Sequence, residues 1–94
     1  MTDFSSLYNH HEREVFNAVA TVAPQFPAIS SNDLLVDVAC VALNRLPPRY
    51  IRHEVDFSFY LTEHERLEID AAISEAVTYA FNFVQARTAL RARR

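Results

Sequence analysis

The chain has 94 residues, one cysteine, no glycine and a formal net charge of −3. This length corresponds to one domain, which we place at residues 1–94 with frayed ends at 1–5 and 90–94. The acidic charge argues against a general DNA-binding protein, and the lack of glycine excludes every Gly-rich phosphate loop. A single cysteine excludes a disulfide or a thiolate metal cage within the chain. The first residues resemble no signal peptide and no run could span a bilayer, so we expect a cytoplasmic protein without membrane contact.

The first predicted helix starts after a cap at Ser5 or Ser6 and carries apolar residues at helical spacing up to Val22. Two prolines follow, and they predict an extended link over Pro24–Ala28. Phe26 lies between the prolines, where we expect it to plug the core.

The second predicted helix runs from about Ser31 to Leu46, after a start signal in which Ser30 and Asp33 resemble a capping box. Apolar residues cover most of its circumference, so we expect it to be the most buried helix. Cys40 is expected to be a small core residue. One polar stripe interrupts the apolar surface at helical spacing, and it consists of Asp33, Asp37, Cys40 and Asn44.

Pro47 and Pro48 stop the second helix and form a stiff corner. After them, apolar and polar residues alternate over His53–Tyr60, which is strand spacing. A lone strand from Val55 to Phe59 would have to pair with a second subunit, and we favour an extended arm instead. The third predicted helix runs from Glu63 to about Ala89 behind a Thr62–Glu65 capping box. The fold class is therefore all-α, with three main helices, an extended segment between the second and third, and an intertwined or face-to-face homodimer that completes the core.

The richest group of binding side chains surrounds the double proline, and it comprises Asn44, Arg45, Arg49, Tyr50 and Arg52. Arginine forks grip phosphate, and tyrosine stacks on bases. Asp37 and Asn44 could read a purine edge. The alternative is a structural cluster in which the arginines pair internally with Glu54, Asp56 and Asp37.

Catalysis and metal binding find little support in the sequence. No activated nucleophile is recognisable, so we do not expect an enzyme. His10 and His11 are adjacent and point about 100° apart on a helix, and His53 and His64 are isolated, so no metal site and no cofactor are expected. Four of the nine arginines fall in the last eight positions, where a solvated helix end is the expected role.

The segment from Asp37 to Tyr50 resembles the late competence development protein family, ComFB. The motif is Asp37 followed by Ala42-Leu43-Asn44-Arg45-Leu46-Pro47-Pro48-Arg49-Tyr50, and Asn9-x-x-Glu12-x-x-Val15 also resembles the opening of the family's first helix. The similarity in order and length covers roughly residues 6–88.

This resemblance implies a small, mostly helical bacterial protein that forms homodimers, is associated with natural competence and binds a cyclic dinucleotide, cyclic di-GMP or cyclic di-AMP. Some members carry extra cysteines that suggest zinc, a feature this chain lacks. The resemblance carries over to Asp37, Asn44, Leu46, Pro47, Pro48, Arg49 and Tyr50. Together with the arginine cluster, it gives the predicted ligand-binding residues Asp37, Asn44, Arg45, Arg49, Tyr50 and Arg52. A downstream protein is a further expected partner. The alternative is a ligand-free interaction module for competence or motility. There the same motif is a helix lock in which Asn44 caps the helix and Arg49 pairs with Asp37.

Overall fold

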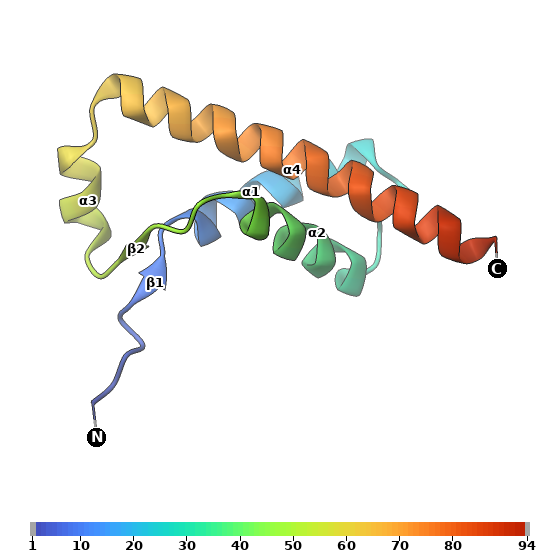
Figure 1. Cartoon of the computed structure of the whole chain (residues 1–94), viewed down its shortest axis with the longest axis horizontal. Helices are drawn as coiled ribbons and strands as arrows, with labels where there is room; N and C mark the ends of the chain where they lie inside the picture. Colours follow the sequence, from blue (N-terminus) through green and yellow to red (C-terminus); the bar gives the residue numbers. More distant parts are fainter. Residues whose placement is uncertain (1, 94) are drawn as a thin grey trace.

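The computed structural model describes residues 2–93, except for the side chains of residues 54, 56 and 58. The elements follow in the order β1 (Tyr8–Asn9), α1 (His11–Val22), η1 (Ala23–Gln25), α2 (Asn32–Arg45), β2 (Tyr50–Ile51), α3 (Glu54–Tyr60) and α4 (Glu63–Ala92). Helix α4 spans the length of the molecule, and α1 and α2 lie along one side of it (Figure 1). The predicted all-α fold with three main helices is therefore confirmed.

The core lies where α4 crosses α1 and α2. Helix α4 supplies the largest share of its buried side chains, namely Ile73, Ala76, Val77, Ala80, Phe81 and Val84. Helix α2 supplies Val38, Ala39 and Ala42, while several of its other apolar residues are only partly buried. Buried and partly buried residues make up more than half of α2, half of α1 and a third of α4, so the expectation that the second helix is the most buried is confirmed. Phe26 packs against this core and stacks on Phe81 with ring centroids 4.7 Å apart, as expected of a core plug.

The beginning of the chain differs from the prediction. Helix α1 starts at His11 rather than near Ser5, because Tyr8–Asn9 forms a short antiparallel pair with Tyr50–Ile51. This pairing satisfies backbone groups of two segments that are remote in sequence. The link after α1 also differs, because Ala23–Gln25 is a 3₁₀ turn and not extended chain.

Residues 54–60 form helix α3, so the extended arm expected there is wrong. A lone strand would leave its backbone donors and acceptors without partners, whereas a helix pairs them within the segment. Before α3, the chain is extended at Leu46 and over β2. Helix α3 lies at one end of the molecule, beside the start of α4 and apart from the core (Figure 1).

The ends of the two long helices follow the sequence signals closely. Ser31 caps α2, since its hydroxyl accepts a hydrogen bond from the Leu34 N–H at 3.2 Å, one residue later than the predicted cap. The Thr62 hydroxyl accepts from the Glu65 N–H at 3.1 Å, as the predicted capping box requires. Helix α4 then continues to Ala92, past its predicted end. Within residues 2–93, none of the helices combines the length and the apolar character needed to cross a bilayer.

Candidate functional site at the double-proline corner

The corner after α2 is held by hydrogen bonds to Asn9 and His10, the two residues before α1. Leu46 has the extended angles φ −95° and ψ 136°, as the residue before a proline prefers. The Arg49 carbonyl accepts from the His10 N–H at 2.7 Å, and the Arg49 N–H donates to Asn9 Oδ1 at 3.1 Å. Both backbone groups of Arg49 are therefore fixed, whatever its side chain does.

Asn9 organises this junction, although it is not among the predicted site residues. Its buried side-chain oxygen also accepts from the His11 N–H at 3.3 Å, at the first turn of α1. One amide oxygen thus joins the start of a helix to the double-proline corner. An asparagine just before a helix is a typical capping residue, and that signal could have identified it. The second donor to this oxygen, the Arg49 N–H, lies 40 positions away and could not have been found from that signal.

Three of the six predicted site residues lie on the solvent side of this corner. Tyr50 is 65% exposed, and Arg49 and Arg52 are exposed as well. The Arg49 guanidinium lies 4.6 Å from the centroid of the Phe57 ring, a cation–π contact with α3. The Arg52 Nε donates to His53 Nε2 at 3.1 Å. The corner therefore presents two guanidinium groups and a phenol ring to the solvent.

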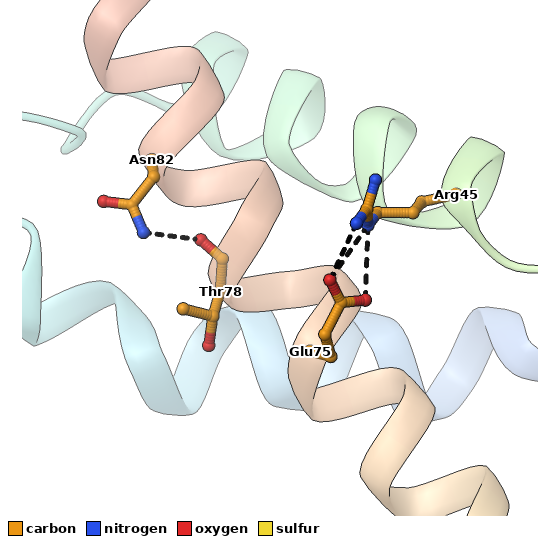
Figure 2. Close-up of polar contacts among 4 residues, drawn as sticks. All are labelled: Arg45, Glu75, Thr78 and Asn82. Atoms are coloured by element: carbon orange, nitrogen blue, oxygen red, sulfur yellow. Dashed lines mark hydrogen bonds and ion pairs between the residues drawn. The ribbon is translucent and has the colours of Figure 1, made fainter.

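Arg45 lies on the other side of the motif and faces α4. Its guanidinium contacts both carboxylate oxygens of Glu75, with the shortest distance 2.8 Å, as Figure 2 shows. It also lies 3.9 Å from the centroid of the Tyr79 ring. The hydrogen bond from Arg45 lowers the pKa of the Glu75 carboxyl, because it favours the ionised form. Arg45 therefore links α2 to α4, and its guanidinium is already engaged by Glu75 and Tyr79.

Asp37 makes a second bridge between the same two helices. Its carboxylate lies 3.4 Å from Arg87, whose guanidinium is also 5.6 Å from the centroid of the Phe83 ring. The expected pair between Arg49 and Asp37 is thus not formed, and that part of the lock interpretation is wrong. The expected pairing with Glu54 and Asp56 concerns side chains outside the described part of the structure.

Asn44 does not cap α2, contrary to the lock interpretation. Its amide donates back to the Cys40 carbonyl at 3.0 Å and lies 3.6 Å from the Cys40 sulfur. Both residues are exposed, so the expectation that Cys40 is a core residue is wrong as well. The reason is helical phase, because Ala39 and Ala42 face the core and turn the polar stripe of α2 towards solvent.

A cavity of about 330 Å³ lies under the corner, where Leu46, Pro47, Pro48 and Arg49 meet α1 and α4. His11 lines it and is buried, with no hydrogen-bond partner for its Nδ1. Burial lowers the pKa of His11, and the neighbouring His10 adds to the effect. Among the side chains that the structure describes, no three His, Cys, Asp or Glu residues come together as a metal site.

The family of late competence development protein ComFB matches residues 8–88. The chain belongs to the ComFB family. The matched region starts at β1 and ends within α4, so it contains both the Asn9 junction and the double-proline corner. Among curated proteins, none matches the chain.

Proposed function

We propose that this ComFB protein is a small cytoplasmic regulatory protein that binds a cyclic dinucleotide, cyclic di-GMP or cyclic di-AMP, as a homodimer. The observation that supports the proposal most is the exposure of Arg49, Tyr50 and Arg52, together with the hydrogen bonds that hold the backbone of Arg49 and the strand pairing of Tyr50. Binding groups that are fixed before the ligand arrives lose little conformational entropy when it binds. The proposed role is binding rather than catalysis.

The three exposed side chains suit the two chemical parts of such a ligand. Arg49 and Arg52 can each offer two parallel N–H donors to a phosphate, and Tyr50 can stack on a purine. The other three residues of the predicted site take supporting parts. Arg45 and Asp37 hold α2 against α4, and Asn44 is exposed on α2, where its amide could read a base edge.

Symmetry makes a dimer the natural form of this receptor. A cyclic dinucleotide with two identical halves has a two-fold axis, and a two-fold dimer presents every corner twice. One ligand on the shared axis would meet two copies of Arg49, Tyr50 and Arg52. The proposal therefore expects one nucleotide for every two chains.

Arg49→Ala tests the proposal at its main residue. The backbone bonds of Arg49 survive this change, and only its exposed cation–π contact with Phe57 is lost, at a cost of about 0.5–1 kcal/mol. We expect nucleotide binding to be abolished in calorimetry while the melting temperature changes little. Arg91→Ala is the matched control, because Arg91 is an exposed arginine in the last turn of α4.

The alternative function is a ligand-free interaction module that couples a downstream protein to competence or motility. Two ion pairs between α2 and α4 support this alternative, because they engage the motif residues Arg45 and Asp37 in contacts that stabilise the fold. If the wild-type protein binds neither nucleotide, or Arg49→Ala binds as tightly as wild type, the receptor proposal fails and the module remains.

A further inference from the structure

A single chain has more surface than a stable monomer of its size. Its accessible area is 6915 Å², whereas a folded monomer of 10.8 kDa exposes about 5,500 Å². Its radius of gyration is 15.3 Å, against about 12 Å for a compact domain of this length. The excess of about 1,400 Å² per chain lies in the range that an obligate homodimer buries on each subunit.

Helix α3 carries the most exposed apolar side chains among those described after β2. Val55 and Phe59 are each 81% exposed, and Tyr60 is 79% exposed. Val55 and Phe59 are four positions apart, so they share one face of the helix. Phe57 is the one described side chain of α3 that is partly buried, between the His10 ring and the Arg49 guanidinium. The helix therefore turns an apolar face away from its own subunit.

A groove elsewhere on the same chain is lined by apolar side chains alone. It encloses about 420 Å³ between α1 and α2, and its walls are Phe16, Val19, Ala20, Leu35, Val36 and Ala39. Phe16 and Val36 are more than half exposed at its edge. A groove without a charged or polar side chain has nothing to orient a polar ligand, so its occupant must be apolar.

We propose that α3 of one chain docks into the α1–α2 groove of a second copy, and that the exchange is reciprocal. Within one chain, α3 lies at one end of the molecule (Figure 1), and none of its described side chains lines the groove. An apolar pair at positions i and i+4 is how a helix anchors in a hydrophobic groove. A face-to-face contact of two grooves would leave Val55 and Phe59 in water. Reciprocal docking covers both apolar surfaces at once.

This inference uses the dimer of the proposed function but needs no nucleotide, so the two can fail separately. Phe59→Asp and Val36→Asp each place a charge in both junctions of the dimer. We expect each to weaken dimerisation by about thirtyfold or more in sedimentation analysis. Leu90→Asp is the control, because Leu90 is as exposed as Val36, at 58%, and lies outside both surfaces.

Mixing the two variants distinguishes reciprocal docking from other interfaces. A mixed dimer has one junction with both substitutions and one with none, so mixing Phe59→Asp with Val36→Asp should restore dimers. If Phe59→Asp alone stays as dimeric as wild type, or mixing restores nothing, the proposed interface is wrong. A monomeric wild type at micromolar concentration would also overturn it.

A cross-link covers the case in which a charged variant does not fold. In a Cys40→Ser background, Val36→Cys combined with Phe59→Cys should give a covalent dimer with a short bis-maleimide. Val36→Cys combined with Leu90→Cys is the control. Equal yields from the two pairs would overturn the inference, whereas a clear excess from the first pair supports it.

Discussion

At the scale of single residues, Asn9 decides how the double-proline corner is held. Its buried oxygen accepts from two backbone donors, the N–H groups of His11 and Arg49. Removing an acceptor from buried donors costs more than the net value of a hydrogen bond, because the donors keep their desolvation penalty. The corner owes its fixed shape to this side chain as much as to its prolines.

Asn9→Ala should therefore lower the free energy of unfolding by about 1–3 kcal/mol, measured by urea denaturation. Asn82→Ala is the control. The Asn82 amide donates to the Thr78 carbonyl on the exposed side of α4, as seen in Figure 2, and its loss should cost far less. Equal losses in the two variants would contradict the role given to Asn9.

His11 should make stability depend on pH. Burial lowers the pKa of its imidazole below the ordinary value of 6.5, so the unfolded chain binds the proton first as pH falls. Stability should then decrease from about pH 7.5 downwards until the folded form is protonated as well. The charges of His10 and Arg49 lower this pKa further, a hydrogen bond with the Pro47 backbone opposes them, and Glu68 lines the same cavity.

Unfolding free energies of wild type and His11→Gln across that pH window measure this effect. The decrease in stability towards acid should be smaller in the variant, because the uncharged amide binds no proton. His64→Gln serves as control, since His64 is exposed and pairs only with Glu68 in the described structure. Identical pH profiles for wild type and His11→Gln would refute the assignment.

At the scale of elements, the sequence predicted the helices whose ends carry strong local signals. Pro47 ends α2 at the predicted place, and Thr62 starts α4 through its hydroxyl. Both signals act within four residues of the boundary they set. The long apolar repeats of α4 could likewise be recognised from spacing alone.

Among the elements that were predicted wrongly, one depends on a partner remote in sequence, and another has a local pattern that fits both a strand and a helix. Tyr8–Asn9 becomes a strand because Tyr50–Ile51 lies beside it, and no local pattern of the first ten residues shows this. Val55, Phe57 and Phe59 alternate as in a strand, yet Val55 and Phe59 also have helical i, i+4 spacing. Without a neighbouring strand to pair with, the helix is the form that satisfies the backbone.

The candidate site could be predicted only in part, again because some of its contacts join residues that are remote in sequence. The position of Arg49 and Tyr50 after two prolines could be deduced, because proline stops a helix locally. The partners of Arg45 and Asp37 could not, because Glu75 and Arg87 lie on α4, 30 and 50 positions further along. Which arginines are occupied depends on tertiary contacts that the motif does not encode.

Thr62→Ala tests the cap at the start of the longest helix. Loss of the hydroxyl that accepts from the Glu65 N–H should cost about 1 kcal/mol of unfolding free energy. Thr21→Ala is the control, because the Thr21 hydroxyl donates back to the Asn17 carbonyl within α1, and it should be nearly neutral. If the two threonines have equal effects in thermal denaturation, the cap does not contribute as described.

At the scale of the whole molecule, the chain forms a thin body of 48 × 39 × 20 Å, in which the apolar α1–α2 groove and the apolar face of α3 are uncovered. A second copy would cover these surfaces and double the exposed corner residues. The proposed receptor therefore depends on dimerisation, and one ligand would contact both chains.

The most direct test is isothermal titration of the folded wild-type protein with cyclic di-GMP and with cyclic di-AMP at physiological salt. The proposed receptor function predicts saturable heat with at least one of the two, at a ratio of one nucleotide to two chains. No heat from either nucleotide, with a protein shown to be folded and dimeric, would contradict it.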